Sequence, residues 1–158
     1  MKRYLVLSVF AVAALAFPAG ATAQSGHFVT GGANAPTCTD AGTTVQCTGK
    51  VAGLGGTTFE ITVEASGIAS ITCANPGNNE DVPGQRKEIT TSGSSGPLPT
   101  PRNGQYVFNV STVAPTAPDD ACPNEQWTPT VVDVEFTEAT ISLFEDGVLS
   151  DQITVPVT

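Results

Sequence analysis

Four cysteines carry the clearest chemical signal in this chain. Cys38 and Cys47 lie either side of Gly42-Thr43, and a glycine in the first of two loop positions is typical of a type II′ β-hairpin. Hydrogen-bonded and non-hydrogen-bonded pairs alternate outward from such a turn. If Cys38 faces Cys47, they form a non-hydrogen-bonded pair, whose side chains come close enough for a disulfide. The other two cysteines then pair as Cys73–Cys122. A zinc site is not expected, because the chain contains no Cys-x-x-Cys motif.

Catalytic residues are harder to find. His27 is the only imidazole and the fourth residue of the expected mature chain. The chain has no G-x-S-x-G motif, and a serine or cysteine nucleophile needs a base to activate it. Asp133 and Glu135 could supply the two carboxylates of a glycosidase, but they alternate with apolar residues and belong on the wet face of a strand. We therefore expect no enzymatic activity, with a carboxylate-dependent hydrolase as the third choice of function.

Two loops hold the candidate binding residues. They cover Asn75–Gly84 and Ala114–Pro129, and a Cys73–Cys122 disulfide would hold them together. Clustered oxygen donors suit calcium, although Asn and Asp also favour turns for backbone reasons and the EF-hand spacing is absent. The candidate calcium ligands are Glu80, Asp81, Asp119 and Asp120. The candidate ligand- or partner-binding residues are Trp127, Asn78, Asn79, Asp119 and Asp120. No organic cofactor is expected.

Trp127 is the only tryptophan, and two roles fit its position in the second loop. It could cap the open end of the core beside the Cys73–Cys122 disulfide. Otherwise it is an exposed aromatic platform for a sugar ring or a protein partner. The first role is the one that the sequence favours.

The first 23 residues are typical of a secretory signal peptide. Lys2 and Arg3 precede a 13-residue apolar run over Leu5–Phe17, and Ala21-Thr22-Ala23 is a small-residue cleavage site. The run is too short to span a bilayer. We expect secretion by the general secretory route, no membrane insertion after cleavage, and one domain over residues 24–158. Both disulfides should form in the oxidising surroundings of an exported protein.

The charge balance restricts the class of partner. Without the signal peptide, four basic residues face fifteen acidic ones, a net charge of −11. Nucleic acids and anionic lipids are bound largely through Lys and Arg, so neither is an expected partner. The partner is unknown; an extracellular protein, a glycan or a small molecule would each be compatible with this charge.

The elements that must position these residues are strands. Thr58–Ala65 alternates apolar and polar residues, which predicts one buried and one wet face of a sheet. Ser66-Gly67 predicts a turn before a partner strand, Ile68–Cys73. The pattern also predicts that Gln105–Val110 is a strand.

The last third of the chain repeats the pattern. Val132, Val134 and Phe136 are expected to point inward from one strand. Ile141–Phe144 and Val148–Val155 lie either side of Asp146-Gly147, a dipeptide that favours a type I′ hairpin.

Short strands separated by Gly-, Pro- and Asn-rich loops predict an all-β fold. We expect an antiparallel two-sheet sandwich, immunoglobulin-like, with about seven to nine strands and the two disulfides Cys38–Cys47 and Cys73–Cys122. A closed barrel is the alternative, but the long Pro-rich connections favour crossings between two sheets.

Several segments together carry a family resemblance: Cys73–Asn78, Val82–Gln85, Cys122–Asn124, Trp127-Thr128, Val134–Thr137 and Asp146-Gly147. In these segments the chain resembles an uncharacterised group of small exported bacterial β-sandwich proteins with two disulfides. The resemblance covers most of the mature chain and implies the fold, but no activity and no catalytic residue. The chain is also similar in outline to the neocarzinostatin-type antibiotic-binding proteins, although its second cysteine pair is spaced far more widely.

The function expected from these observations is that of an exported, non-catalytic binding or structural module. Recognition would use the loops at one end of the sandwich, because loops on a rigid frame commonly carry binding residues. The alternative is a small-ligand carrier with a cleft between the two sheets.

Overall fold

The computed structural model describes residues 25–77 and 81–158, so the signal peptide expected over residues 1–23 lies outside the described residues. The described residues form ten strands and two short 3-10 helices, without an α-helix, and none of their helices is long and apolar enough to cross a membrane. This confirms the all-β prediction, with one strand more than the upper end of the expected range. The strands are β1 (His27–Phe28), β2 (Thr37–Asp40), β3 (Val45–Ala52), β4 (Thr58–Ala74), β5 (Asp81–Pro83), β6 (Lys87–Ser94), β7 (Leu98–Pro99), β8 (Tyr106–Ser111), β9 (Thr128–Glu145) and β10 (Val148–Pro156). The 3-10 helices are η1 (Gly32–Asn34) and η2 (Asp119–Ala121).

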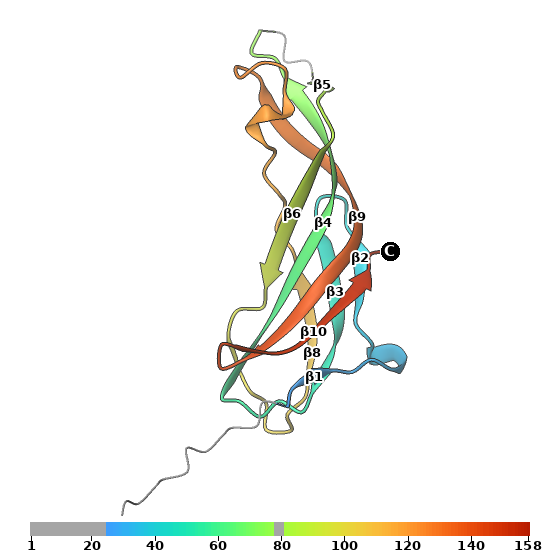
Figure 1. Ribbon diagram of the computed structural model, residues 1–158, viewed down its shortest axis with the longest axis vertical. Coiled ribbons are helices and arrows are strands. Elements are labelled where there is room, and N and C mark those ends of the chain that lie inside the picture. The colour runs from blue at the N-terminus through green and yellow to red at the C-terminus, as the bar shows by residue number, and fades with distance from the viewer. Residues whose placement is uncertain (1–24, 78–80) are drawn as a thin grey trace, which may run out of the picture.

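The strands form two sheets that pack against each other (Figure 1). In the small sheet β3 is central, with β8 along one edge and β1 and β2 along the other. In the large sheet the order is β10-β9-β4, and the far edge of β4 pairs with β7, β6 and β5 in turn. All of these strand pairs are antiparallel, which confirms the expected sandwich. The C-terminal residue Thr158 accepts a hydrogen bond from the Asp40 N–H at 3.1 Å and so ties the end of β10 to β2.

The hairpin between β2 and β3 forms as expected. Cys38 pairs with Cys47, and the two residues form a disulfide with a Cα–Cα distance of 4.1 Å. Such a short distance is typical of a non-hydrogen-bonded pair. At the turn, the Ala41 N–H donates to the Thr44 carbonyl at 2.9 Å, and Gly42 has a φ of 85° while Thr43 does not enter the positive region. This is the pattern of a type II′ turn.

Strand β4 is the centre of the large sheet, but it does not end at Ala65. The expected turn at Ser66-Gly67 and the separate partner strand Ile68–Cys73 are wrong, because β4 continues through both to Ala74. Gly67 keeps an extended backbone and allows close approach: a Cβ there would lie 2.6 Å from the Glu135 carbonyl oxygen of β9. The glycine therefore lets β4 and β9 pair closely at a register shift, and it does not reverse the chain.

Two register shifts in β9 decide which of its side chains face the core. Val134 and Phe136 are buried as expected, but Val132 is wrong, since it is 52% exposed. Ser70 pairs with Asp133 and Ile71 with Val131, so that Val132 is the extra residue of a bulge and turns outward. Beyond the second shift, between Ser66 and Gly67 on β4, the inward positions are Ala139, Ile141, Leu143 and Glu145.

The turn between β9 and β10 is confirmed. Asp146 and Gly147 have φ values of 49° and 80°, and Glu145 pairs with Val148. A type I′ turn requires positive φ at both central residues. The expected strand Ile141–Phe144 is part of the longer β9, and Val148–Val155 corresponds to β10.

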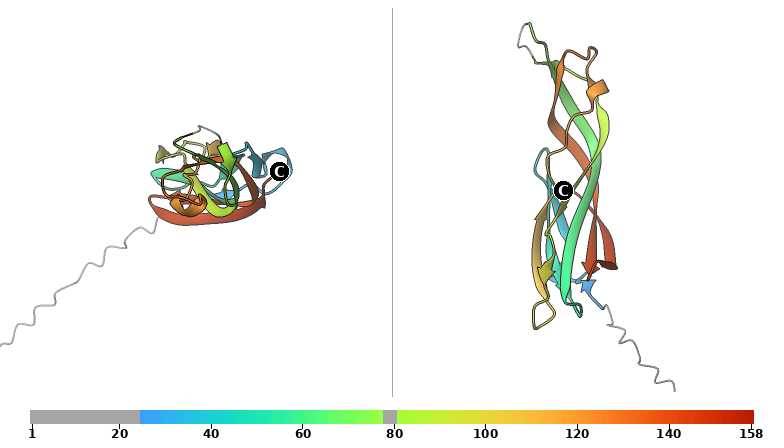
Figure 2. Two further views of the ribbon diagram at one scale, coloured as in Figure 1. Left: turned by 90° about the horizontal axis from the view of Figure 1, so that it is seen from above. Right: turned by 90° about the vertical axis from the view of Figure 1, so that its left-hand side faces the viewer.

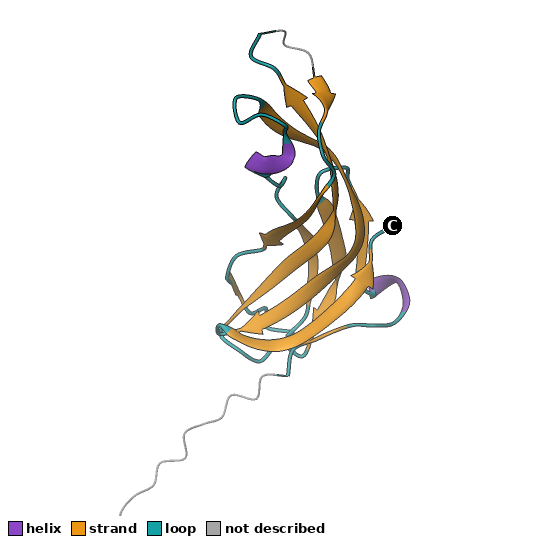
Figure 3. Ribbon diagram, turned by 45° about the horizontal axis from the view of Figure 1, so that its top comes forward, coloured by secondary structure: helices purple, strands orange, loops and turns teal. Residues whose placement is uncertain are grey.

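The molecule is elongated, and the small sheet covers only one half of the large sheet (Figures 1 and 2). The other half is covered by the segment between β8 and β9, with η2 against the ends of β4 and β9 (Figure 3). We call this the loop end.

The sequence predicted that Asn75–Gly84 is loop throughout. In the structure, Asp81–Pro83 of this segment forms the short strand β5 and pairs with β4. The Gln85 N–H donates to the Ala121 carbonyl at 3.0 Å, which joins the two loops.

The chain crosses between the sheets just after β8, and there Gly93 of β6 lies against the main chain of Ser111. This close approach leads to the first testable prediction. A Cβ on Gly93 would lie 2.0 Å from the Ser111 carbonyl oxygen, so Gly93→Ala must push two backbones apart. We expect a loss of about 1–3 kcal/mol in the free energy of unfolding, measured by urea titration. Gly31→Ala is the matched control, because a Cβ on Gly31 would have no atom within 4 Å and the φ of this residue is −121°. Equal stability of the two variants would contradict this account.

Candidate functional site

An open hollow at the loop end gathers several of the expected binding residues. It has a volume of about 590 Å³ and is formed by η2 and by the chain that leads from η2 into β9. We call it the loop-end hollow. Its lining residues are Asp119, Asp120, Cys122, Pro123, Glu125, Trp127 and Pro129.

The second disulfide fixes this hollow to the large sheet. Cys122 is bonded to Cys73 near the end of β4, with a Cα–Cα distance of 5.9 Å, as the sequence predicts. Packing around the bond is tight: a Cβ on Gly84 would lie 2.9 Å from the Cys73 sulfur. Ala121, next to Cys122, is fully buried. The loop therefore has a covalent attachment to the large sheet at Cys122, which also lines the hollow, and a packed attachment at Ala121.

A local turn directs Trp127 into the hollow. The Asn124 side-chain oxygen accepts a hydrogen bond from the Gln126 N–H at 2.9 Å, and the Asn124 carbonyl accepts one from the Trp127 N–H at 3.0 Å. Asn commonly makes such turns. Trp127 is half-buried and lies outside the main core cluster of the described residues. It lines the hollow together with Cys122, it is not among the partly buried residues that pack against the core cluster, and part of its surface is open.

The loop-end hollow is acidic. Asp119, Asp120 and Glu125 are exposed on its wall. Lys87 of β6 pairs with Asp120, with 2.9 Å between Nζ and Oδ2. One ammonium for three carboxylates leaves the hollow with a net negative charge.

The calcium prediction is only partly covered by the structure. Asn78, Asn79 and Glu80 lie outside the described residues, and Asp81 is placed only as the first residue of β5. Over residues 25–77 and 81–158, no group of three or more Asp, Glu, His or Cys side chains is arranged to hold a metal ion. Calcium binding therefore stays a sequence-based prediction.

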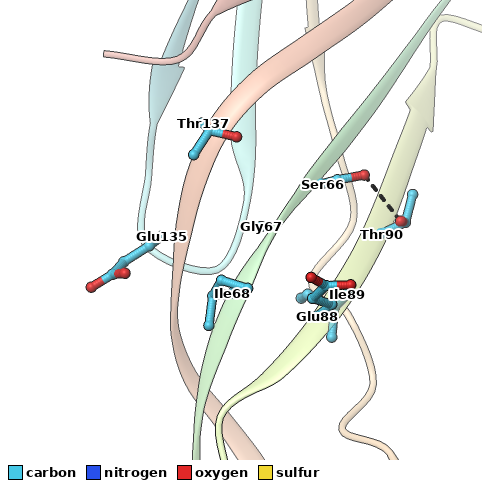
Figure 4. Close-up of a pocket in the computed structure, with 8 residues that line it drawn as sticks. All are labelled: Ser66, Gly67, Ile68, Glu88, Ile89, Thr90, Glu135 and Thr137. Carbon is cyan, nitrogen blue, oxygen red and sulfur yellow. Dashed lines mark hydrogen bonds between the residues drawn. The ribbon is translucent and has the colours of Figure 1, made fainter.

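The carboxylates considered for hydrolysis lie on the surface. Asp133 and Glu135 are exposed on the outer face of β9, as expected, and Glu135 forms an ion pair with Arg86. Glu135 also borders a shallow hollow over β6, β4 and β9, together with Ile68 and Glu88 (Figure 4). These carboxylates are open to water, the ordinary setting of solvated acidic side chains.

A buried carboxylate that the sequence did not reveal lies at the opposite end of the molecule. Glu145, the last residue of β9, is 0% exposed. Its Oε1 accepts hydrogen bonds from the N–H groups of Gly55 and Gly56, at 2.7 and 3.1 Å. Its Oε2 accepts from the Gly26 N–H at 2.9 Å and from the Ser150 hydroxyl at 2.7 Å. One carboxylate thus joins the N-terminal segment, the loop before β4 and the start of β10.

The surroundings of Glu145 keep it ionised. Burial raises the pKa of the carboxyl group, but the hydrogen bonds from Ser150, Gly55, Gly26 and Gly56 outweigh burial and hold the pKa below its usual value. A buried carboxylate with a perturbed pKa is often catalytic. Both oxygens accept hydrogen bonds from fixed donors, and the N–H groups of Gly26, Gly55 and Gly56 among these donors belong to the main chain, so we assign Glu145 a structural role.

The comparisons with known proteins identify no family. No protein-family model matches the chain, and no curated protein matches it. Two solved structures of glycosyl hydrolase family 2 members from Bacteroides cellulosilyticus align with 84% of this chain, at 16% and 17% sequence identity. The alignments cover 14% and 15% of those chains, with TM-scores of 0.36 and 0.33. Similarity this low supports no conclusion about function.

Proposed function

We propose that this protein is an extracellular binding module without catalytic activity, and that the loop-end hollow is its recognition surface. It would reach the exterior by the general secretory route after loss of residues 1–23. The observation that carries the proposal is the placement of Trp127, half-buried and open to solvent on a loop held by the Cys73–Cys122 disulfide. The two disulfides also suit an oxidising environment.

The attachment of the loop matters because binding costs entropy. A loop that is already ordered loses less freedom when a partner binds, so more of the contact energy appears as affinity. Partly buried tryptophans beside polar residues are frequent energetic centres of interfaces. An extracellular protein, a glycan or a small molecule could each use such a surface, whereas its negative charge opposes nucleic acid.

The carrier alternative needs a cleft between the two sheets. In the described part of the chain this space holds packed side chains, among which Phe59, Ile61, Phe108 and Leu143 are at most 2% exposed. The loop-end hollow and the hollow beside Glu135 both lie on the outside of the sandwich. No observation therefore favours a carrier over the binding module.

The second prediction tests this recognition surface. We expect Trp127→Ala to weaken capture of the partner from the native secretion fluid at least about tenfold, because interface tryptophans commonly contribute more than 1.4 kcal/mol. Leu149→Ala is the control, since Leu149 is an exposed apolar residue at the opposite end of the molecule. Binding can be measured by pull-down with quantitative mass spectrometry.

Two outcomes would overturn the proposed surface or function. If Trp127→Ala and loop-swapped variants retained every interaction of the wild type, the loop-end hollow would not be the recognition surface. If native mass spectrometry of protein purified from its secretion fluid showed a small molecule enclosed with it, the carrier would replace the binding module.

A further inference from the structure

Strand β8 forms an edge of the small sheet that no other strand covers. It pairs with β3 from Val51↔Tyr106 to Gln46↔Ser111, and with no second strand in the described residues. In the right-hand view of Figure 2, β8 (yellow-orange) runs along the outer side of the molecule. Which of its main-chain groups face outward follows from the hydrogen bonds around β3.

The two neighbours of β3 fix the direction of each main-chain group. The Thr112 N–H donates to the Val45 carbonyl at 2.9 Å, so Val45↔Thr112 is a hydrogen-bonded pair. Such pairs alternate in an antiparallel ladder, so the even-numbered residues of β8 bond to β3. The short Cα–Cα distance between Cys38 and Cys47 agrees, because it leaves the main chain of Cys47 facing β8. The odd-numbered residues of β8 therefore direct their N–H and C=O groups away from β3.

Three residues face this open edge: Val107, Asn109 and Ser111. The Ser111 carbonyl is covered by Gly93 of β6, as the crossing described above requires. For Val107 and Asn109, no described residue donates to or accepts from the main chain on the open side. Their side chains are also exposed, and Val107 is 68% exposed. Two residues thus present a free main-chain donor and acceptor each.

The edges formed by β2, β5, β6, β7 and β10 carry features that oppose strand addition. Proteins commonly protect edges with proline, charge, bulges or covering segments. Strand β8 has an unbroken register and contains neither proline nor a charged residue. The protective features elsewhere are the register shift between Leu149 and Asp151 and Pro156 in β10, Pro83 in β5, Lys87 and Glu88 in β6, Pro99 in β7, and Thr158 against β2.

The distribution of charge indicates which partner this edge suits. The chain holds fifteen acidic residues and has a formal net charge of −9, yet neither β3 nor β8 contains an Asp or Glu. The outward side chains of β3 beside β8 are Gln46, Thr48 and Lys50. A neutral or cationic partner would not require a surface free of carboxylates. A second copy of the same acidic chain does require one, because like charges would repel at the edges of β2, β5, β6 and β10, which contain Asp40, Asp81, Glu88 and Asp151. Among the described edge strands of more than two residues, β8 is the one without Asp or Glu.

We propose that two copies of this chain associate through their β8 edges and join their small sheets into one. A two-fold axis at Phe108 places Val107 opposite Asn109 of the partner subunit and Asn109 opposite Val107 of the partner subunit. Each of these pairs exchanges two main-chain hydrogen bonds, so every open group of Val107 and Asn109 gains a partner. The loop-end hollow takes no part in this interface, so the dimer is independent of the proposed binding function.

The third prediction tests the dimer with isosteric variants of the oxidised mature chain. In sedimentation velocity over about a hundredfold range of concentration, we expect the wild type to convert from monomer to dimer. Asn109→Asp adds a carboxylate on each side of the axis and is expected to weaken the dimer at least about tenfold. Asn124→Asp adds the same charge at the loop end and keeps the acceptor for the Gln126 N–H, so its dimer should equal that of the wild type.

A backbone variant and amide exchange locate the interface. Val107→Pro removes an outward N–H that β3 does not use, and it should also weaken the dimer at least about tenfold. Amides of Val107 and Asn109 should exchange more slowly in the dimer than in the monomer. A wild type that stays monomeric over the whole range overturns the proposal. So does a dimer that neither Asn109→Asp nor Val107→Pro weakens, or protection of this edge only when a different protein is added.

Discussion

Replacing Glu145 with alanine is expected to lower the free energy of unfolding at pH 7 by about 3–5 kcal/mol. The substitution removes the acceptor of three main-chain N–H groups, those of Gly26, Gly55 and Gly56, and of the Ser150 hydroxyl. Donors that lose their partner in a buried setting carry the full cost of desolvation. Water cannot easily replace the carboxylate unless the end of the sandwich opens.

The conservative variant separates charge from volume. Glu145→Gln keeps the shape and one acceptor oxygen, but its NH₂ group faces at least one main-chain N–H in either orientation, so we expect an intermediate loss of about 2–3 kcal/mol. Urea unfolding of the two variants and the wild type measures both values. If Glu145→Ala cost less than about 1 kcal/mol, the carboxylate would not be the tie between the three segments.

The same carboxylate makes stability depend on pH in a known direction. The pKa of Glu145 lies below its usual value of 4.5 in the folded protein. Its contribution is therefore complete above that usual value and is lost as the pH falls through the folded pKa. Hydrogen bonds from the main chain of Thr58 and Thr57 also lower the pKa of Asp146, which adds a loss of the same sign. The fall in stability on acidification should be shallower in Glu145→Gln than in the wild type.

Much of the fold follows from local patterns in the sequence. The odd-numbered residues of β4 are buried from Phe59 to Ala65 and again from Ala69 to Cys73, so the phase does not change at Gly67. A turn would be expected to interrupt the alternation of buried and exposed residues. Because the alternation continues unchanged past Gly67, it indicates that Ser66-Gly67 lies inside one strand. The two hairpin turns were predictable because Gly42-Thr43 and Asp146-Gly147 meet conformational demands that few dipeptides meet.

The faces of β9 could not be predicted in the same way. A bulge reverses the facing of all later residues in its strand, and its position depends on the partner backbone. The sequence alone places Val132 on the same face as Val134 and Phe136. It also contains no local pattern that predicts burial of Glu145. The glycines that donate to Glu145 could serve as a hint, but they are Gly26 and Gly55-Gly56, far away in the chain.

The candidate site was predictable in outline only. The pairing of Cys73 with Cys122 follows from the hairpin assignment of the other two cysteines, and it brings Asp119, Asp120 and Trp127 to one end of the molecule. The orientation of Trp127 depends on the turn at Asn124 and on packing around Ala121, neither of which spacing alone reveals. Loop side chains are set by such contacts, whereas strand side chains are set by a repeating backbone.

Removing the Cys73–Cys122 disulfide is expected to lower the free energy of unfolding by about 4 kcal/mol, because the bond closes 49 residues of otherwise free chain. The double variant Cys38→Ala/Cys47→Ala opens only 9 residues, and the same chain-entropy relation gives a loss of about 3 kcal/mol. Urea unfolding of the two double variants under identical conditions measures the difference. Equal losses, or a larger loss at Cys38–Cys47, would contradict the entropic origin.

The two variants should differ more sharply at Trp127, which is the only tryptophan and therefore a local reporter. Cys73→Ala/Cys122→Ala releases the loop from the large sheet, so the native-state fluorescence of Trp127 should shift to the red and partner binding should fall with it. Cys38→Ala/Cys47→Ala lies in the other sheet and should change neither property while the protein remains folded. If the loop-end hollow kept both its fluorescence and its binding without Cys73–Cys122, packing around Ala121 would be sufficient to hold it. The disulfide would then stabilise the fold without positioning the recognition surface.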